Sequence, residues 1–422
     1  MRCVPRPNTV WLRRTPSTTG LKSLAESIPS AITFIRRQTP RPTWRKLGVE
    51  VISAHARFLD GESVELPDSR TQARRVLSSR FFIIATGSRP KIPNIDGIVG
   101  VQVLTNENLF ELKEQPRRLL VLGAGPIGIE MAQAFRRLGS EVIVTDHGAR
   151  ILGHDDAELA AMLEQSLRSE GIGFRLGAEV EQFEPGMATL KGGERIPFDA
   201  VLAAAGRRPN SESLQLAAAG VESNEEGIIV DDRCRTTRKN IFACGDVTGK
   251  YLFTHMAEHT AKVAVMNAIL HIPSRADDRR ISWCTFTDPE LARVGLGEEE
   301  LRKRGESFRV YRFPFSKLDR AITESESAGL VKVWAGKQGK ILGASIFGAN
   351  AGEMIAEYAL AMKVNAGLGK VSATIHPYPT YALGNRRAAD NFANQVLTPS
   401  RVTWIQRLFR LRGTSTGVLH LD

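Results

Sequence analysis

The stretch GAGPIGIE at residues 123–130 decides the fold, because of what lies on both sides of it. An apolar run at 119–122 precedes it, and apolar residues at helical spacing follow at 131–138. A second apolar run, 142–145, ends at Asp146. Strand, glycine turn, helix, strand and acid in this order are typical of a dinucleotide-binding βαβ unit. A glycine-rich turn that merely joins two packed elements is the alternative.

Each glycine of this turn has its own physical reason. Gly123 permits the tight turn, Gly125 lets the backbone approach a pyrophosphate, and Gly128 lets the helix pack closely on the strand. The helix is expected to begin near Pro126 and Ile127, where its unpaired N–H groups can bind phosphate oxygens.

Asp146 bears on which dinucleotide would bind. Its carboxylate can accept hydrogen bonds from an adenosine ribose, which favours NAD over NADP. His147 and Arg150 follow closely in the sequence and weaken that preference.

The length of the chain and the spacing of its cysteines limit the classes of protein to which it can belong. A chain of 422 residues is long enough for two or three domains with ample core. No apolar run reaches the roughly 18 residues that a membrane-spanning helix needs. The cysteines show no CxxC or CxxxxC spacing, which suits a reducing compartment and predicts no structural disulfide or zinc site. We therefore expect a cytoplasmic protein without a bound metal. The cysteines are Cys3, Cys234, Cys244 and Cys284.

The net charge of +11 comes from the two ends of the chain. Residues 1–46 hold ten Lys or Arg and one acid, and residues 386–422 hold six Arg and two Asp, so the residues between carry a net charge of −2. A folded body of this charge lacks the basic surface that nucleic-acid binding requires. We therefore expect no nucleic-acid partner.

Residues 1–46 differ from the rest, because they are rich in Arg, Pro, Ser and Thr and lack sustained periodicity. Their composition fits an organellar transit peptide, a wrongly assigned start or out-of-frame translation joined to a real protein, or a disordered basic arm. We favour the second interpretation, which leaves organellar targeting as the less favoured alternative to a cytoplasmic location.

Short apolar runs bounded by turn residues predict strands on both sides of the dinucleotide unit. Within that unit, a helix is expected over 155–170 and a hairpin over 179–197. An amphipathic helix is expected over 252–270. The predicted strands are 49–52, 56–58, 64–66, 81–85, 172–176, 201–205 and 240–247.

Two segments resemble each other. ATGSRP at 85–90 and AAGRRP at 204–209 each follow an apolar strand, which suggests two nucleotide-binding folds in one chain, with a chance match as the alternative. Gly245 and Asp246 end a further short strand. An acid at a strand end suits a polyhydroxyl ligand, whereas an ordinary turn or helix cap is the alternative.

Beyond residue 279 the pattern predicts a separate α+β domain over 279–395. The tail, 396–422, contains WIQRLFRLR at 404–412, an apolar stripe with Arg between. We expect this tail to dock on its own chain or on a partner subunit, and membrane-surface binding is the less favoured alternative. In this domain, strands are predicted at 283–286, 308–313, 329–334 and 341–347, and helices at 298–304 and 352–365.

Five motifs in order resemble those of the pyridine nucleotide-disulfide oxidoreductases, a family that includes dihydrolipoamide dehydrogenase, glutathione reductase and mercuric reductase. The resemblance covers 47–395 and is nearest to the mercuric-reductase-like group. It implies an α/β fold with two Rossmann-like domains and a C-terminal α+β dimerisation domain. An NAD(P) domain, 116–230, would be inserted into an incomplete FAD domain formed by 47–115 and 231–278. The motifs are IIATGSRP (83–90), GAGPIGIE (123–130), AAAGRRPN (203–210), NIFACGD (240–246) and IHPYPT (375–380).

The resemblance implies two cofactors, FAD and NAD(P)H, with NADH favoured. Glu130 would approach the nicotinamide amide and Asp146 the adenosine ribose. Asp246 would bond the FAD ribityl chain, and Thr254 would offer backbone near the flavin ring. The implied NAD(P)H residues are Gly123, Gly125, Pro126, Ile127, Gly128, Glu130, Asp146 and Gly206, and the implied FAD residues are Thr86, Gly87, Gly245, Asp246 and Thr254.

The sequence departs from the family at two places. The family begins with its own GxGxxG unit for FAD and a redox-active CxxxxC helix, and neither occurs in this sequence. Without the cysteine pair, no dithiol can take electrons from a flavin and no thiolate can attack a disulfide or bind Hg(II). Cys244 and Cys284 lie on predicted buried strands, and we expect them to be inert core residues.

The second departure lies in IHPYPT. Disulfide reductases have an acid/base His directly before Pro-Thr, oriented by a Glu five residues later; here Tyr378 takes the His position and Leu383 the Glu position. His376 lies two places earlier and is expected to point elsewhere. With a pKa near 10, a tyrosine is a poor base at neutral pH but a serviceable donor. Tyr378 and His376 are the candidate catalytic residues, and simple packing at a dimer interface is the alternative.

The predicted function is that of a homodimeric, FAD-dependent NAD(P)H oxidoreductase with a thiol or disulfide, a metal or a quinone as its small-molecule acceptor. The alternative is a catalytically impaired fragment that binds NAD(H) and dimerises. A third hypothesis is a cysteine-independent NADH oxidase or diaphorase, which needs only a bound flavin and an acceptor.

Overall fold

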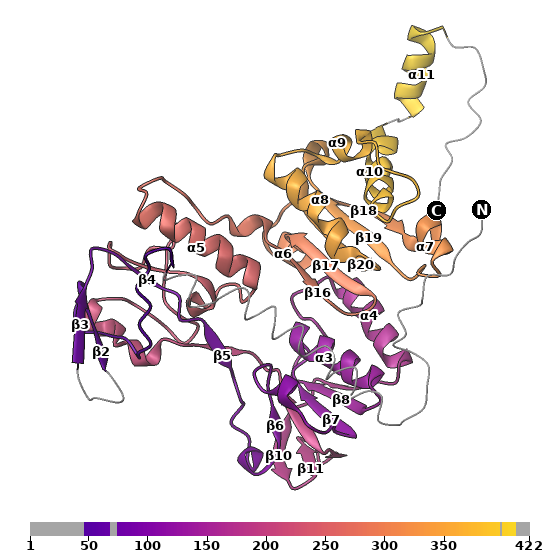
Figure 1. The fold of residues 1–422 in the computed structure, drawn as a ribbon. Coiled ribbons are helices and arrows are strands. Elements are labelled where there is room, and N and C mark those ends of the chain that lie inside the picture. The colour runs from indigo at the N-terminus through magenta and orange to yellow at the C-terminus, as the bar shows by residue number, and fades with distance from the viewer. Residues whose placement is uncertain (1–45, 68–73, 397–398, 411–422) are drawn as a thin grey trace. The chain divides into compact units, whose positions relative to one another are not determined.

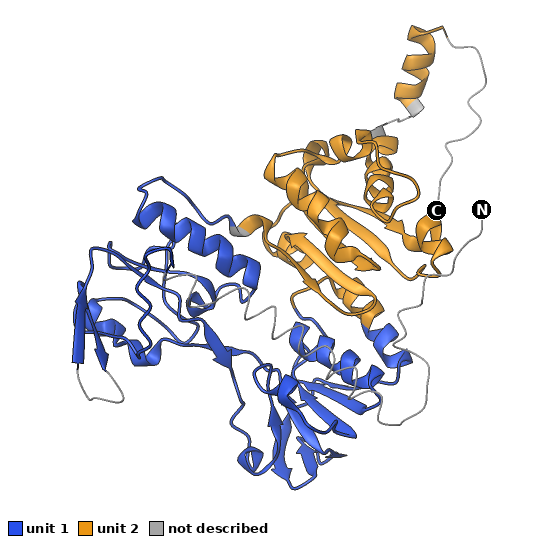
Figure 2. Ribbon diagram, in the orientation of Figure 1, with its two compact units in different colours: residues 1–153, 164–278 blue, residues 154–163, 279–422 orange. Residues whose placement is uncertain are grey.

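The computed structural model describes residues 46–67, 74–396 and 399–410, and Figure 1 shows their elements. The chain divides into two compact units, which Figure 2 distinguishes by colour. The first consists of residues 1–153 and 164–278, and the second of residues 154–163 and 279–422. Nearly all of the atypical segment 1–46 therefore lies outside the described residues.

The first unit contains a five-stranded parallel sheet in the order β6-β13-β7-β8-β9. Its strands β9, β8, β7 and β13 follow the 3-2-1-4 order of a Rossmann half, and this confirms the predicted βαβ unit. Helix α3 joins β7 to β8, and α4 joins β8 to β9 (Figure 1). The bounds are β6 Val103–Leu104, β7 Arg118–Leu122, α3 Pro126–Arg137, β8 Glu141–Asp146, α4 Ala157–Ser169, β9 Gly173–Leu176 and β13 Ala200–Ala203.

Burial explains why these segments take these forms. The four residues 119–122 of β7 are all at most 5% exposed, as expected for a parallel strand covered on both faces. Helix α3 buries Ile129, Ala132 and Phe135, which recur every three residues and so lie on one face.

The segment between β9 and β13 forms a three-stranded antiparallel meander instead of the predicted hairpin. Its strands are β10 (Val180–Glu184), β11 (Met187–Leu190) and β12 (Arg195–Pro197). The sequence shows no alternation in β12 because that strand is only three residues long.

The rest of the first unit forms smaller sheets. Strand β4 (Phe82–Ile84) pairs in parallel with β15 (Ile241–Ala243), and α5 (Thr254–Ala268) follows. The predicted strand at 49–52 is wrong, because these residues are exposed or half-buried and lie outside every strand. A meander is formed by β1 (Arg57–Phe58), β2 (Ser63–Pro67) and β3 (Arg74–Ser78).

The two repeated segments lie side by side in the first unit. Strand β5 (Ser88–Pro90) pairs antiparallel with β14 (Arg207–Pro209), so that Arg89 lies opposite Arg208. Just beyond the pair, the Lys91 amide donates to the Gly206 carbonyl at 3.0 Å. The repeat therefore marks both chain crossings between the dinucleotide sheet and the β4–β15 sheet.

The second unit is built on a five-stranded antiparallel sheet in the order β16-β17-β20-β19-β18. One face packs against α8 and α10 in the largest apolar core (Figure 1). Strand β17 and helices α9 and α10 had not been predicted. The bounds are β16 Ser282–Thr285, β17 Glu290–Gly295, α6 Glu298–Lys303, β18 Arg309–Pro314, α7 Asp319–Thr323, β19 Leu330–Ala335, β20 Ile341–Gly348, α8 Ala351–Lys363, α9 Leu368–Ala373, α10 Leu383–Val396 and α11 Pro399–Leu408.

The opposite face of this sheet carries a buried ion network. Lys332, on β19, is 3% exposed and donates to Asp156 at 2.9 Å and to Glu158 at 3.0 Å. Glu298 lies 3.4 Å from the same ammonium. The alternation of β19 thus places an apolar face on the core and Lys332 among carboxylates.

No helix among the described residues is both long enough and apolar enough to cross a membrane. The described elements combine a Rossmann-like parallel sheet with an antiparallel α+β domain, which is the predicted mixed α/β class.

Candidate nucleotide-binding site

The glycine turn after β7 has no room for side chains at two of its positions. Gly123 has a φ of +110°, and a Cβ there would lie 2.5 Å from the Ala204 carbonyl oxygen. A Cβ on Gly128 would lie 2.0 Å from the Gly123 carbonyl oxygen. At Gly125 nothing lies within 4 Å of such an atom, and the backbone is extended. The turn is therefore closed around Gly123 and Gly128 and open beside Gly125.

Helix α3 begins at the open side of this turn. Gly125 is its N-cap residue, no side chain caps it, and Pro126 occupies the first turn, followed by the exposed side chain of Ile127. The partial positive charge of an uncapped helix N-terminus suits a phosphate. The predicted residues 123–128 thus form a cradle that a pyrophosphate would fit.

Asp146 clamps the same turn from the end of β8. Its Oδ2 accepts from the Ala124 amide at 2.7 Å, and its Oδ1 accepts from the Gly148 amide at 2.6 Å. The Ala124 carbonyl accepts in turn from the Leu152 amide at 2.9 Å. Each carboxylate oxygen can accept a second hydrogen bond, so both retain capacity for ribose hydroxyls.

The two basic residues near Asp146 differ in their surroundings. The Arg150 guanidinium donates to the Leu152 carbonyl at 3.1 Å and to the Gly153 carbonyl at 2.7 Å. His147 lies 3.4 Å from Asp146 Oδ1 with an 82% exposed side chain. Arg150 is therefore tied to the loop backbone, whereas His147 is accessible to solvent.

The remaining residues expected at this site lie near the turn. Gly206 has a φ of +112° with open space on its Cβ side, and it follows the Ala204 carbonyl that abuts Gly123. Glu130 is half-buried on α3.

A second cluster joins the residues expected to face FAD. Asp246 Oδ2 accepts from Ser88 Oγ at 2.7 Å and lies 3.5 Å from Arg207 Nε. Arg207 also donates to Ser88 Oγ at 2.7 Å and to the Ser88 carbonyl at 2.9 Å. Thr86 Oγ1 donates to the Asn210 carbonyl at 2.7 Å. The two repeated segments thereby place Ser88 and Arg207 beside Asp246 and join Thr86 to Asn210.

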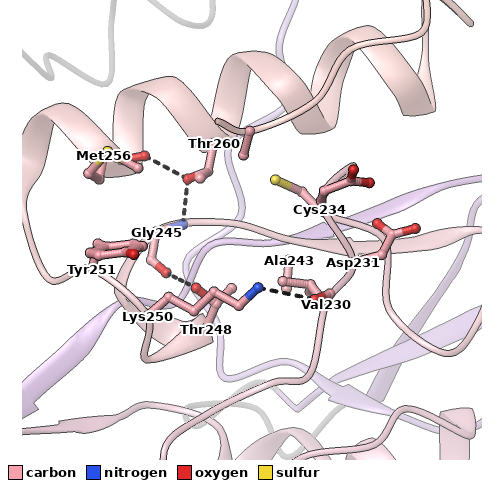
Figure 3. Close-up of a pocket in the computed structure, with 12 residues that line it drawn as sticks. Val230, Asp231, Cys234, Ala243, Gly245, Thr248, Lys250, Tyr251, Met256 and Thr260 are labelled. Atoms are coloured by element: carbon pink, nitrogen blue, oxygen red, sulfur yellow. Dashed lines mark hydrogen bonds between the residues drawn. The ribbon is translucent and has the colours of Figure 1, made fainter. Parts of the chain in front are cut away.

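A small cavity adjoins this cluster on the α5 side. It has a volume of about 100 Å³ and is lined in part by Gly245, Thr248, Met256 and Thr260 (Figure 3). The Gly245 amide donates to Thr260 Oγ1 at 3.0 Å, and Thr254 is exposed at the start of α5. Cofactor sites usually enclose about 300 Å³ or more. A cavity of this size therefore fits only one part of a FAD molecule.

The thiols of Cys234 and Cys244, near this cavity, are unreactive. Cys234 and Cys244 are 2% and 3% exposed, and burial raises the pKa of both, that of Cys234 to about 12. Cys284 is half-buried on β16. Because thiolate is the reactive form, the Cys234 and Cys244 thiols are inert at neutral pH. Among the described residues, no three His, Cys, Asp or Glu side chains cluster as metal ligands do.

Tyr378 and His376 lie in the loop between α9 and α10 and have separate partners. Tyr378 is 69% exposed and donates to Asp319 Oδ2 at 2.8 Å. This hydrogen bond raises the pKa of the phenol, which makes it a still poorer base. Leu383, in the position of the family's glutamate, is buried.

His376 has a 5% exposed side chain and faces acceptors at both ring nitrogens. Nδ1 lies 3.0 Å from the Thr374 carbonyl oxygen, and Nε2 lies 2.9 Å from Glu357 Oε1. The other oxygen of Glu357 accepts from Asn385 at 2.9 Å. His376 thus points away from Tyr378, as expected, and is held by α8.

Sequence reasoning missed several members of these clusters. Ser88 and Arg207 lie inside the repeated segments that the sequence displayed, so the repeat itself was the available signal. Asp319 and Glu357 lie on other helices, and no local pattern connects them with the IHPYPT loop.

Known proteins resemble most of this chain. A family model described as pyridine nucleotide-disulphide oxidoreductase matches residues 6–267, and the dimerisation domain of the same family matches residues 281–388. A mercuric reductase of Lysinibacillus sphaericus is 33% identical over 92% of this chain and 71% of that protein. The mercuric reductase of Bacillus cereus is also 33% identical over 92% of this chain, which spans 62% of that longer protein.

Two further proteins extend the comparison. A dihydrolipoyl dehydrogenase of Thermus scotoductus is 37% identical over 83% of this chain and 76% of its own length. Among solved structures, the HOCl-induced flavoprotein disulfide reductase RclA of Escherichia coli superposes with a TM-score of 0.78 at 26% identity. That superposition covers 88% of this chain and 84% of the RclA chain.

Proposed function

Since this chain belongs to the pyridine nucleotide-disulphide oxidoreductase family, whose members use FAD and NAD(P)H, we propose that it is a flavin-dependent oxidoreductase that takes its electrons from NADH. One observation carries the proposal: the uncapped start of α3, with Asp146 clamping the glycine turn beside it. Residues 123–128 would hold the pyrophosphate, Asp146 the adenosine ribose, Glu130 the nicotinamide amide, and Gly206 would line the same cleft.

NADH is proposed over NADPH because of charge. A 2′-phosphate beside the Asp146 carboxylate would bring like charges together, and Arg150 is tied to the loop carbonyls. Asp146→Ser should weaken the preference for NADH. The NADPH dissociation constant divided by the NADH dissociation constant should fall by about tenfold or more. An unchanged ratio would contradict this assignment.

The flavin would rest on the Asp246 cluster. Thr86, Gly87, Gly245, Asp246 and Thr254 are the proposed contacts, because Asp246 offers an acceptor to hydroxyl groups and β4 and β15 end beside it. FAD, when bound, supplies hydride acceptance from NADH and electron donation to a second substrate. The cavity of about 100 Å³ beside Gly245 would hold one part of the cofactor.

The acceptor is proposed to be a small molecule that needs no thiolate from the described residues. Cys234 and Cys244 cannot exchange with a disulfide at neutral pH, because burial raises both pKa values. A quinone or a metal ion meets this condition, and Tyr378, with its exposed side chain, is the proposed contact. His376 is proposed to position the loop through Glu357.

The match to the dimerisation domain indicates that the chain forms a homodimer. The antiparallel sheet of the second unit, with α8 and the α9–α10 loop, is the proposed interface. Several exposed apolar side chains of this unit support it, namely Phe286, Leu360, Val364, Ile375 and Tyr378.

A second function is favoured by the small cavity and by the inert thiols of Cys234 and Cys244: a chain that binds NADH and dimerises without turnover. The visible spectrum of the purified chain separates the two. A flavin band that NADH bleaches without oxygen supports the enzyme, and a colourless protein that still binds NADH supports the second function.

Two variants make this experiment specific. Asp246→Ala should release flavin and leave NADH binding intact, because the carboxylate lies in the second cluster only. Asp146→Ala should have the opposite effect, since it removes the clamp on the glycine turn. If both variants lose both ligands equally, the assignment of separate sites is wrong.

A further inference from the structure

We propose that helix α11 (Pro399–Leu408) binds the surface of anionic phospholipid membranes. The helix lies outside every element used by the nucleotide-binding residues, and the inference is independent of the proposed function. The sequence alone favoured docking of this tail on its own chain or on a partner subunit over membrane binding. Three observations, on the exposure, the pattern and the charge of the helix, favour the membrane instead.

Three large apolar side chains of α11 and of the residue after it are accessible, whereas Val402 and Ile405 are half-buried. Trp404, Leu408 and Phe409 are 63%, 56% and 66% exposed. Large apolar side chains exposed together mark a surface that binds something else.

These side chains lie on one face. At 100° per residue, five apolar residues fall within an arc of about 160°, and Thr403, Gln406 and Arg407 occupy the other side. Arg410 follows just beyond the end of the helix. Arg401, in the first turn, is the one basic residue on the apolar side of the described helix, and a long arginine can extend its charge to the polar boundary. The apolar residues are Val402, Trp404, Ile405, Leu408 and Phe409.

The charge of this segment is of one sign. Between Asp390 and Asp422 the sequence contains no acid and four arginines, Arg401, Arg407, Arg410 and Arg412. An aromatic and aliphatic face combined with arginines is the pattern of a helix that lies in the plane of a membrane interface. A helix of ten residues is too short to span the bilayer.

Anionic lipid fits this helix better than other occupants. A ten-residue helix is about 15 Å long, which is too small to bury the roughly 1,000 Å² that a stable protein interface needs. A nucleic acid would pair with the arginines but would leave Leu408 and Phe409 uncovered. At a lipid interface the apolar side chains contact the acyl chains and the arginines contact the anionic headgroups, and no shape complementarity is required.

Flotation of the full chain with vesicles tests the proposal. The protein is mixed with vesicles of phosphatidylcholine alone or of equal parts phosphatidylcholine and phosphatidylserine, and is then centrifuged through a density gradient. Lipid-bound protein floats, whereas aggregated protein sinks. We expect flotation with the phosphatidylserine vesicles only, and less of it at high salt because surface charges are screened.

Matched variants assign the binding to α11. Each arginine near an anionic surface contributes about fivefold to binding, so Arg407→Gln with Arg410→Gln should weaken it about 25-fold. Trp404→Ser should weaken it about tenfold or more. Arg304→Gln and Phe110→Ser, which change an exposed arginine and an exposed aromatic residue elsewhere, should bind as the unmodified chain does.

A spectroscopic readout accompanies these variants. The difference in fluorescence between the unmodified chain and Trp404→Phe reports on Trp404 alone, and it should shift to shorter wavelength with phosphatidylserine vesicles. The proposal is overturned if no protein floats, or if the α11 variants float as well as their controls. It is also overturned if Trp404→Ser dissociates the dimer and leaves flotation unchanged, since the face would then cover a second copy.

Discussion

Gly125 and Gly128 lie in the same turn, but their replacement has different physical consequences. A Cβ on Gly125 meets nothing within 4 Å, so Gly125→Ala should fold normally and place its methyl group where the pyrophosphate would approach. A Cβ on Gly128 would lie 2.0 Å from a carbonyl oxygen, so Gly128→Ala should destabilise the fold by about 2 kcal/mol. Calorimetry measures both the thermal transition and the binding of NADH.

The expected result is that Gly125→Ala loses at least about tenfold in NADH affinity at unchanged stability. Gly128→Ala should lose both affinity and stability. Gly100→Ala, at an open position outside the turn, is the control and should change neither. Normal NADH binding by Gly125→Ala would show that the pyrophosphate does not lie on this turn.

Lys332 is the most deeply buried cation of the ion network. Burial opposes its charge, but hydrogen bonds to Asp156 and Glu158 outweigh burial and hold the pKa of Lys332 above its ordinary value. Its contribution to stability is therefore present at neutral pH and is lost only as the pH rises through the raised pKa. Lys332→Met should cost about 3 kcal/mol or more in denaturant unfolding, because Asp156 is left buried without this cation.

The double variant Lys332→Met with Asp156→Leu tests the cause. Removing both charges should recover part of the loss, since no buried carboxylate then loses its cation at this position. If the double variant loses more free energy of unfolding than the two single variants lose together, the network is not the source of the effect.

Residue by residue, the sequence predicted what is local and missed what is distant. The glycine turn could be predicted because its requirements are imposed by residues a few positions away. The burial of Lys332 could not be predicted, because its partner Asp156 lies 176 residues earlier and nothing in β19 indicates a buried charge. Arg207 is part of a repeated motif that the sequence shows, but only the fold brings it close to Asp246.

Among the elements, a bidentate ion pair joins β5 to the short 3-10 helix Glu212–Leu214 that follows β14. Arg89 donates to both carboxylate oxygens of Glu212, at 2.7 and 3.1 Å. The hydrogen bond from Arg89 lowers the pKa of Glu212 to about 2. A lowered pKa gives stability that is present above the ordinary glutamate pKa and is lost as the pH falls towards 2.

Glu212→Gln should therefore flatten the loss of stability between about pH 4.5 and pH 2. Solvent screens this half-exposed pair, so the effect at neutral pH should be about 1 kcal/mol or less. Urea unfolding at a series of pH values measures it, with Glu225→Gln, at an exposed glutamate, as the control. Parallel pH curves for Glu212→Gln and the unmodified chain would contradict the role of this pair.

Elements with clear periodicity were predicted, and short or context-dependent ones were not. The strand expected at 49–52 is apolar enough in sequence but has no neighbouring strand to bond in the part of the chain that the structure describes. Strand β17 was missed because Arg293 interrupts its apolar run, and its guanidinium is accommodated by Glu300 at 2.6 Å. Helix α10 carries Arg386, Arg387 and Asp390 within its first two turns, which hides its buried Ala388 and Ala389.

At the scale of the whole molecule, the β4–β15 sheet has one side that no described strand covers. Among the described residues, β4 pairs only with β15, and Phe82 and Ile83 are half-buried. An unpaired strand edge with apolar neighbours promotes edge-to-edge association. We predict that the purified chain aggregates at micromolar concentration, which light scattering would detect.

A charged residue at this edge serves as the test. Ile83→Lys should reduce scattering if the β4 edge is the point of association, because edge lysines oppose strand addition. Ile322→Lys, at an exposed apolar position of the second unit, is the control. A monodisperse, flavin-loaded dimer of the unmodified chain would show that this edge is covered.

The pairing of β5 with β14 brings the two ends of the segment 91–206 together, since the Lys91 amide and the Gly206 carbonyl lie 3.0 Å apart. A segment whose ends meet can be removed or exchanged as a cassette without stretching the chain on either side. Residues 154–163 of this segment belong to the second unit, where Asp156 and Glu158 bond Lys332. Recombination could therefore exchange the dinucleotide sheet with both cuts made at one hydrogen-bonded point, provided that the replacement supplies the carboxylates that Lys332 needs.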